Sequence, residues 1–329
     1  MPVIPSQFRP PHFLRNGHVQ TVLSALLPRR VDVRFERERL ELADGDFLEL
    51  DWALSDQKRL AILSHGLEGN SSNGCIRGMA AALIAAGWAV LAWNFRGCGG
   101  EPNRLARFYH SGETGDLAAV IEHGMRTDVR IQQIALIGFS LGGNVTLKYL
   151  GEGPPHPAVV AGVGISVPVD LAASARVLDG RWSNRIYLRR FMTSLVAKVE
   201  AKARMFPQQL DVTGARAIRT FAQFDGRYTA PLHGFRDEED YWARSSARQF
   251  LPQITIPTLL LNARNDPFLA PQCFPFAEAE ENPALFLEVP DSGGHVGFLD
   301  LVHGFQPWSE RRVVEFLERA VRPGGLLTG

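Results

Sequence analysis

One serine of this 329-residue chain stands between glycines, in the stretch Gly138-Phe139-Ser140-Leu141-Gly142. Four apolar residues, 134–137, precede the stretch with the length and composition of a buried parallel strand, and a helical pattern follows it. A serine on so sharp a turn needs a strained backbone, and the flanking glycines leave room for the close crossing of strand and helix. The pattern therefore predicts that Ser140 is an exposed nucleophile; the alternative is a glycine-rich turn with an incidental serine.

A base for this serine is expected late in the chain. A serine hydroxyl is a weak nucleophile, so it needs a base, and the base needs a third group to orient it. Where a serine sits on such a turn, the acid and then the base follow it along the chain, on loops after late strands. Of the nine histidines, His295 fits because it lies in the glycine-rich loop 290–298, directly after a predicted strand. His303 lies near the final helix, where a surface role is expected.

The orienting acid has one leading candidate and one rival. Asp266 directly follows the predicted strand 258–261. Asp170 follows the strand that ends at Val167, another place where such an acid could lie. Asp291 is too near the histidine on the same loop to reach behind its ring. We therefore expect Asp266 to orient the base.

Two backbone N–H groups are expected to stabilise the tetrahedral intermediate. The first belongs to Leu141, immediately after the serine and at the positive end of the following helix. The second belongs to Leu67, in the loop that follows the strand 60–64 and begins with His65-Gly66. Each donor would contribute about 3 kcal/mol of transition-state stabilisation. The alternative reading of His65-Gly66 is a simple turn at the strand end.

The elements that must position these residues alternate between strand and helix patterns. The first two strands are joined by a hairpin turn at Asp44-Gly45. Ser111 is a plausible N-cap for the helix near 116–125. Such alternation indicates an α/β fold whose mostly parallel sheet has helices on both faces. Strands are expected at 31–42, 47–54, 60–64, 88–94, 134–137, 159–167, 256–262 and 284–289, and helices at 16–27, 76–86, 116–125, 273–281 and 308–320.

The alternation stops between residues 172 and 250, where only helical patterns such as 186–199 appear. We interpret 172–250 as a helical cap inserted into one core, formed by 31–171 and 251–329. Basic side chains outnumber the acids Asp179 and Glu200 there, which could orient an anionic headgroup, although a solvated helix face is the expected role. These basic residues are Arg176, Arg181, Arg185, Arg189, Arg190, Lys198, Lys202 and Arg204.

Residues 1–30 form an N-terminal extension in this division. Asn16 could cap a helix over 16–27, in which Val19, Val22, Leu23 and Leu26 make one apolar stripe. The helix could touch lipid or roof a substrate pocket; we expect it to pack on the main domain.

Composition excludes several classes of function. Lysine and arginine together equal aspartate and glutamate at 35 each, so nothing indicates a nucleic-acid partner. Three scattered cysteines predict neither disulfides nor a metal site, and no phosphate-binding loop of the G-K-[ST] type is present. No cofactor is therefore expected. The first residues lack the features of a signal peptide, and no apolar run reaches the ~18 residues of a membrane span, so we expect a cytoplasmic protein.

The chain resembles the α/β-hydrolase superfamily, specifically its YheT-like branch of serine esterases and acylglycerol or phospholipid hydrolases. The resemblance implies the α/β-hydrolase fold and ester hydrolysis on acyl chains, with Ser140, Asp266 and His295 matching the family triad. The family usually has two aspartates before Pro267, whereas the first position here is Asn265, which leaves Asp266 as the only carboxylate there. The motifs that carry the resemblance are N-G-H-V-Q-T (16–21), H-G-L-E-G (65–69), N-F-R-G-C-G-G (94–100), Y-H-S-G-E-T-G-D-L (109–117), G-F-S-L-G-G-N (138–144), T-A-P-L-H-G-F (229–235), D-Y-W (240–242), N-D-P (265–267) and G-G-H-V-G-F (293–298).

The sequence thus predicts a serine ester hydrolase that works through an acyl-enzyme. Its partner would be a small acyl ester of short to medium chain length, monoacylglycerol-like lipids included. An acyltransferase would use the same three residues, and the acceptor pocket would decide between the two. A non-catalytic binding protein on a hydrolase scaffold is the third alternative, against which a complete set of catalytic residues argues.

Overall fold

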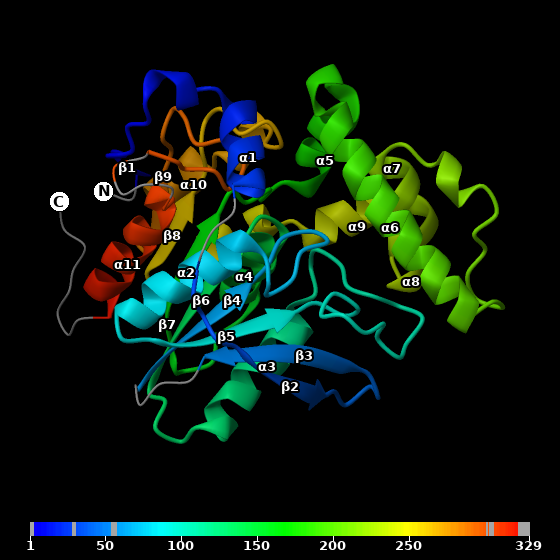
Figure 1. The fold of residues 1–329 in the computed structure, drawn as a ribbon, viewed down its shortest axis with the longest axis horizontal. Coiled ribbons are helices and arrows are strands. Elements are labelled where there is room, and N and C mark those ends of the chain that lie inside the picture. The colour runs from blue at the N-terminus through cyan, green and yellow to red at the C-terminus, as the bar shows by residue number, and fades with distance from the viewer. Residues whose placement is uncertain (1–2, 28–30, 54–57, 301, 303–305, 322–329) are drawn as a thin grey trace.

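The computed structural model describes residues 3–27, 31–53, 58–300, 302 and 306–321. A nine-stranded sheet runs through this part of the chain in the order β1-β9-β8-β7-β6-β4-β5-β3-β2 (Figure 1). Only the pairs β2–β3 and β3–β5 are antiparallel. The predicted α/β class and mostly parallel sheet are therefore confirmed. The strands are β1 (Val3–Ile4), β2 (Glu36–Glu41), β3 (Phe47–Ala53), β4 (Arg59–Ser64), β5 (Ala89–Asn94), β6 (Gln133–Phe139), β7 (Val159–Ile165), β8 (Thr258–Leu261) and β9 (Leu285–Glu288).

Helices cover both faces of the sheet, so each face has its own hydrophobic core. Ile62 and Leu136 point to the core under α3 and α4, whereas Leu63 and Ile137 point to the core under α2 and α11. This alternation follows from the period of two along a strand, and it explains why the central strands are apolar at nearly every position between their ends. The helices are α1 (Gly17–Leu26), α2 (Gly74–Ala85), α3 (Thr114–Thr127), α4 (Leu141–Glu152), α5 (Leu171–Gly180), α6 (Arg185–Met205), α7 (Phe221–Phe224), α8 (Ala230–Leu232), α9 (Glu238–Ser245), α10 (Phe276–Glu281) and α11 (Trp308–Ala320).

The segment between β7 and β8 contains helices and turns but no strand among its residues, all of which the structure describes. These inserted helices lie together at one end of the sheet, on the right of Figure 1. Leu188 and Leu195 of α6 belong to the same core as the α3–α4 face of the sheet. The insertion is therefore packed onto the sheet through apolar side chains.

Several local predictions need correction. The short strand β1 was not predicted, and β2 begins at Glu36 and not at residue 31. Ser111 does not cap α3: Glu113 stands at the N-cap position without a capping side chain, and the hydroxyl of Ser111 accepts a hydrogen bond from Tyr241 at 2.8 Å. A tertiary contact with the insertion thus outweighs the local capping preference. Residue 54 of the second predicted strand lies outside the described residues.

Helix α1 forms as predicted, but it turns its polar side inward. Asn16 caps it by accepting hydrogen bonds from the backbone N–H groups of His18 and Val19. Gln20 is fully buried, and its side-chain amide makes two hydrogen bonds with the backbone of Leu299, at 2.8 and 2.9 Å. The apolar stripe instead faces outward, with Leu26 70% exposed. Helix α1 therefore contacts the loop of Leu299 by the face opposite to its apolar stripe.

Candidate active site

Ser140 stands in the tight turn between β6 and α4. Its backbone has φ 52° and ψ −118°, a region that residues other than glycine rarely adopt. A Cβ atom at Gly138 would lie 2.3 Å from the carbonyl oxygen of Gly142, and one at Gly142 would lie 2.4 Å from that of His65. These contacts show why the chain needs glycines on both sides of the serine.

The structure brings Ser140, His295 and Asp266 together from three separate loops. The Nε2 atom of His295 lies 2.9 Å from Oγ of Ser140, and its Nδ1 atom lies 2.9 Å from Oδ2 of Asp266. The Asp266 side chain is fully buried, and its other oxygen accepts a hydrogen bond from the backbone N–H of Phe268 at 2.9 Å. An ionised Asp266 accepts only, so Nδ1 carries the proton and Nε2 is free to accept the serine proton.

The rival candidates have other roles. Asp170 caps α5 by accepting a hydrogen bond from the backbone N–H of Ala173 at 2.9 Å. The Asp291 side chain is 93% exposed and lies 3.4 Å from Arg264. His303 lies outside the described residues. Asp266 is therefore the carboxylate that meets His295.

Three partners that the sequence did not indicate hold the histidine loop. The backbone N–H of His295 donates to the hydroxyl of Thr21 on α1 at 2.8 Å, and that of Val296 donates to Ser166 at 2.9 Å. The ring of Phe268 lies against the imidazole, with centroids 4.2 Å apart. Val296 has a positive φ of 56°, so this loop is strained and depends on such contacts. No local pattern marks Thr21 or Ser166, because their partners are remote in sequence.

Asn265, which stands where the family usually has an aspartate, ties α1 to the histidine loop. Its Nδ2 donates to the carbonyl of Arg15 at 2.7 Å, and its Oδ1 accepts from the backbone N–H of Gly294 at 3.0 Å. A carboxylate could accept the second bond but could not donate the first. An amide at this position therefore suits a chain in which α1 approaches this closely.

The loop of Leu67 lies beside the serine and is held by the insertion. A Cβ at Gly66 would lie 3.3 Å from Cβ of Ser140, which shows how closely the loop passes. The next residue, Glu68, has φ 53°, and its carboxylate accepts hydrogen bonds from Tyr109 at 2.8 Å and from Ser194 of α6 at 2.6 Å. Lys198 of α6 forms an ion pair with the same carboxylate at 2.7 Å. Helix α6 is thus bonded directly to the loop predicted to bind the oxyanion.

This buried ion pair corrects one expectation about the basic residues of the insertion. Lys198 faces Glu68, and Lys202 is 2% exposed, with its ammonium donating to the carbonyl of Leu105 at 2.6 Å. Burial lowers the pKa of Lys202 to about 8. The solvated part of the basic set consists of its six arginines, Arg176, Arg181, Arg185, Arg189, Arg190 and Arg204.

A largely apolar cavity of about 110 Å³ opens beside Ser140 and His295. The sheet side and the insertion both line it, and most of the lining is aliphatic or aromatic. Asp225 is the buried acid in its wall; its oxygens accept hydrogen bonds from Thr229 at 2.7 Å and Trp242 at 2.9 Å. Burial raises the pKa of Asp225 to about 7, against the lowering effect of these two bonds. The apolar lining includes Leu67, Phe108, Leu141, Leu171, Leu178, Phe191, Leu195, Phe221, Phe224 and Phe268.

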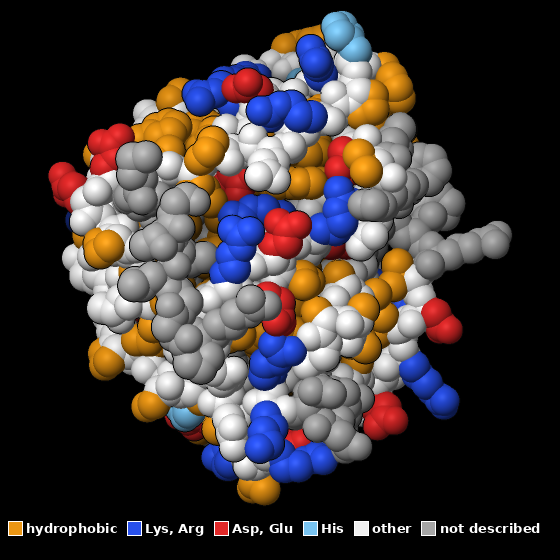
Figure 2. Space-filling model, turned by 90° about the vertical axis from the view of Figure 1, so that its left-hand side faces the viewer, with side chains coloured by type: hydrophobic (Ala, Val, Ile, Leu, Met, Phe, Trp, Pro, Cys, Tyr) orange, Lys and Arg blue, Asp and Glu red, His pale blue; other side chains and the backbone are white. Residues whose placement is uncertain are grey.

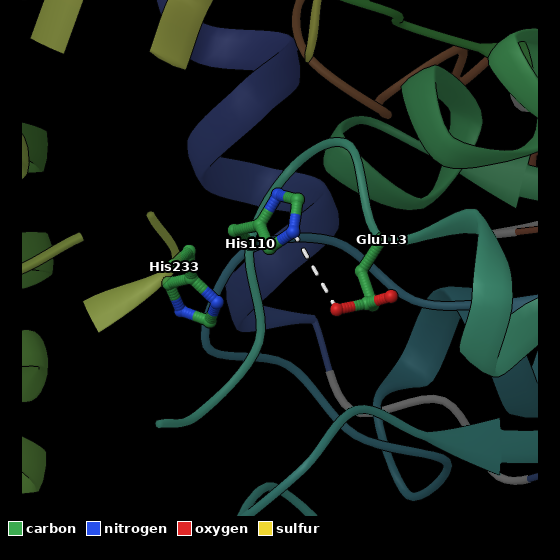
Figure 3. Close-up of side chains that lie close together, drawn as sticks. All are labelled: His110, Glu113 and His233. Carbon is green, nitrogen blue, oxygen red and sulfur yellow. Dashed lines mark ion pairs between the residues drawn. The ribbon is translucent and has the colours of Figure 1, made fainter. Parts of the chain in front are cut away.

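A second cluster of titratable side chains adjoins this cavity, because one of its members, His110, is part of the cavity lining. His110 and Glu113 precede α3, and His233 approaches them from the insertion (Figure 3). Possible ligand atoms of the three lie within 4.8 Å of one another, although their spacing in the sequence indicated no metal site. Nε2 of His110 lies 3.5 Å from Oε2 of Glu113.

The hydrogen bonds of the second cluster oppose metal binding. The backbone N–H of Gly112 donates to Nδ1 of His110 at 3.1 Å, so the neutral ring carries its proton on Nε2, the atom that faces Glu113. Arg107 donates to the same glutamate oxygen at 2.9 Å. A metal ion would need both the unprotonated nitrogen and the free oxygen. The chemistry of these donors fits a hydrogen-bonded pair beside an arginine better than a metal centre.

Comparison with known proteins places the chain in a family. Residues 62–300 match the α/β hydrolase fold family. The chain belongs to the α/β hydrolases. YheT of Escherichia coli, whose name assigns it to the esterases, is 35% identical over 95% of this chain and 93% of its own length. The phospholipase ABHD3 of Bos taurus is 27% identical over 98% of this chain and 81% of its own length. The predicted resemblance to the YheT-like branch is thereby confirmed.

The solved structure of an esterase from Pyrococcus furiosus has the same fold, with a TM-score of 0.61 at 19% identity, and the match covers 89% of this chain and 92% of the other. The family match and these relatives show that this chain is an enzyme of the esterase and lipase type. No helix in the described part of the chain is long and apolar enough to cross a membrane.

Proposed function

We propose that this α/β hydrolase cleaves carboxylic esters through an acyl-enzyme formed on Ser140. The distances of 2.9 Å from His295 to Ser140 and to Asp266 carry the proposal. Nε2 of His295 takes the serine proton while Oγ attacks the ester carbonyl carbon, and the same proton then passes to the leaving alcohol. In the second step, water gives its proton to His295 and attacks the acyl carbonyl, which releases the acid and restores the serine. Asp266 stabilises the imidazolium in both steps.

The oxyanion is assigned to the backbone N–H groups of Leu67 and Leu141. Leu141 is the first residue of α4, so its N–H group points out of the positive end of that helix. Both leucines line the same cavity as Ser140 and His295. A donor aimed at the developing negative charge is worth about 3 kcal/mol.

The apolar cavity is assigned to the acyl chain, and the inserted helices of 172–250 to a cap over it. The wall is built from leucine and phenylalanine side chains of the sheet side and of the insertion. Such a wall suits a hydrocarbon chain and offers few polar partners to a charged acyl group. We place the substrate among esters of short to medium acyl length, including monoacylglycerol-like lipids.

Replacement of the serine tests the chemistry. Ser140→Ala should lower hydrolysis of p-nitrophenyl acyl esters by several orders of magnitude and abolish labelling by a fluorophosphonate probe. Ser72→Ala, at an exposed serine of the neighbouring loop, is the matched control and should keep full activity. Intact activity in Ser140→Ala would overturn the proposal.

A panel of esters of graded acyl length, measured with and without an added alcohol, extends the test. Hydrolysis should dominate and should be best for short to medium chains. Acyl transfer to the alcohol that exceeds hydrolysis would assign the enzyme to the acyltransferases.

A further inference from the structure

Two apolar segments that lie far apart in the sequence are exposed on the described surface. On α1, Leu26 is 70% exposed, and Val22 one turn earlier is 38% exposed. At the start of α6 and in the turn before it, Trp182 is 77% exposed and Ile186 is 73% exposed. Single exposed apolar residues are ordinary, but two helix segments that both present large ones are not.

A ring contact joins these segments into one surface. His18 of α1 stacks on Tyr187 of α6, with centroids 5.8 Å apart and planes 4° from parallel, and its Nδ1 lies 3.1 Å from the tyrosine hydroxyl. Val22 and Leu26 follow His18 at intervals of four, so they share its side of the helix. Ile186 is the sequence neighbour of Tyr187. We call this surface the α1–α6 face. It is formed by Val19, Val22, Leu26, Trp182, Arg185 and Ile186, with the exposed Arg181, Arg189 and Arg190 beside them.

The charge of the α1–α6 face has one sign. The sequence contains no acid before Asp32, and within 171–199 it contains only Asp179. The carboxylate of Asp179 is occupied because it accepts hydrogen bonds from the backbone N–H groups of residues 221 and 222. The arginines at 181, 185, 189 and 190 are exposed and form no ion pair with any residue in the described part of the chain.

Other parts of the surface differ in this respect. Figure 2 shows a face on which basic, acidic and hydrophobic side chains are interspersed. Elsewhere in the described part of the molecule, arginines have acidic partners, as Arg59 has Glu318 and Arg312 has Glu288. The α1–α6 face thus combines large exposed apolar side chains with four arginines that form no ion pair within the described residues.

The α1–α6 face also lies close to the candidate active site. The ring of Tyr187 meets that of Phe268 with centroids 4.9 Å apart, and Phe268 in turn lies against the imidazole of His295. On the α1 side, Thr21 accepts the hydrogen bond of the His295 backbone. One residue thus separates the stacked pair from the catalytic histidine.

We infer that the α1–α6 face docks the enzyme on an anionic lipid surface. Apolar side chains would enter the headgroup region, and the arginines would meet the lipid phosphates, as in peripheral amphipathic helices. A second copy of this chain is disfavoured as occupant, because two copies of an acid-free basic face repel each other. That the docked enzyme takes its ester from this surface rests on the proposed function; the docking itself does not.

Vesicle sedimentation tests the docking. Binding of the full chain is measured on phosphatidylcholine vesicles and on vesicles that also contain phosphatidylglycerol. Wild type should bind the anionic vesicles, more weakly as salt is raised, and bind the neutral ones at least about 10-fold less. The double substitution Arg185→Gln with Arg189→Gln should weaken anionic binding by about 30-fold. Leu26→Glu combined with Trp182→Glu should weaken it by about 10-fold or more.

The control is Val129→Glu, which places one glutamate at an apolar residue that is 89% exposed just after α3, and it should bind like wild type. All variants should hydrolyse a soluble p-nitrophenyl ester at the wild-type rate, which shows that they are folded and separates docking from catalysis. Equal binding to both kinds of vesicle, or equal loss in the control, would overturn the inference. A wild-type dimer in analytical ultracentrifugation that Leu26→Glu with Trp182→Glu dissociates would assign the face to a second copy and also overturn it.

Discussion

Two of the histidine–carboxylate pairs in the described part of the chain, those of His295 and His110, differ in what meets the other nitrogen of the ring. In the first pair, Asp266 accepts from one nitrogen of His295, and the hydroxyl of Ser140 lies 2.9 Å from the other. In the second pair, Glu113 faces one nitrogen of His110, and a backbone N–H occupies the other. The first ring can accept a proton from a nucleophile; the second has no nucleophile beside it.

The carboxylates differ as well. Asp266 is fully buried, and its side-chain oxygens meet the backbone N–H of Phe268 and Nδ1 of His295. Glu113 also forms an ion pair with Arg107 at 2.9 Å, and its pKa, although burial would raise it, is lowered to about 2 by the bonds and charges of His110 and Arg107. A histidine beside an acid is therefore no evidence of catalysis; the third partner decides.

The largest expected difference between the pairs is in turnover. Asp266→Asn should reduce kcat by about 10⁴-fold, because the amide favours the wrong tautomer of His295. Glu113→Gln should leave kcat for a soluble p-nitrophenyl ester within about 3-fold of wild type. Steady-state kinetics of both variants check this. A comparable loss in Glu113→Gln would break the comparison and give the second pair a part in the reaction.

The second pair should instead affect stability. Glu113→Gln removes the charge that Arg107 and His110 face, so we expect the free energy of unfolding to fall by about 1–3 kcal/mol. Urea denaturation monitored by tryptophan fluorescence measures it. Glu239→Gln, whose ion pair with Arg176 is exposed on both sides, is the control and should change stability by less than about 1 kcal/mol.

His233 offers a change in the opposite direction. Both of its ring nitrogens are buried and have no hydrogen-bond partner among the described residues, and its ring meets that of Phe108 edge to face at 5.8 Å. His233→Phe removes two unsatisfied polar atoms and keeps an aromatic ring there, so stability at pH 7 should stay equal or rise by about 1 kcal/mol. A clear loss in thermal denaturation would show that the nitrogens have a partner in solution.

The smallest expected effect is the pH dependence of stability in the wild type. Burial and the neighbouring His110 lower the pKa of His233 to about 3, so its contribution to stability is present above pH ~6.5 and is lost as the pH falls towards 3. Burial raises the pKa of Asp225 to about 7, so its contribution is present below pH ~4 and is lost as the pH rises towards 7. The two slopes oppose each other between pH 4 and 6.5.

Each group can be removed to expose the other. His233→Phe should make stability fall as the pH rises through this window, whereas Asp225→Asn should make it rise. Urea midpoints at pH 4.5, 5.5 and 6.5 would measure both slopes, each expected below about 1.4 kcal/mol per pH unit. Identical slopes in the two variants and the wild type would contradict the assignment.

Much of the site could be predicted from the sequence because each of its parts has a local cause. The glycines around Ser140 are needed by a turn that the chain makes within five residues, because a Cβ atom at Gly138 or Gly142 would lie only 2.3 or 2.4 Å from a backbone oxygen. The positions of Asp266 and His295 follow from the strands before them, because carboxyl ends of parallel strands meet at one edge of a sheet. The final helix, predicted at 308–320, is observed over Trp308–Ala320 for a similar reason, since its amphipathic pattern lies within the helix itself.

Local patterns could not decide features that depend on a remote partner. Ser111 looked like a helix cap, but Tyr241, 130 residues away, takes its hydroxyl. The outward stripe of α1 looked like a packing surface, but Gly17, Gln20 and Thr21 fit the loops around His295 more closely. In both cases the tertiary hydrogen bond satisfies a buried polar group. The free energy of leaving that group unsatisfied is larger than the local preference.

The sequence by itself therefore determined the α/β hydrolase fold and the order of serine, acid and histidine, because strand burial and tight turns are properties of short segments. Only the tertiary structure decided which face of α1 is exposed, which lysines of the insertion are buried, and that His110, Glu113 and His233 meet. These depend on residues brought together from distant parts of the chain, as at Glu113 and His233. Packing and hydrogen bonding act through space, and a local pattern along the chain does not identify the remote partner.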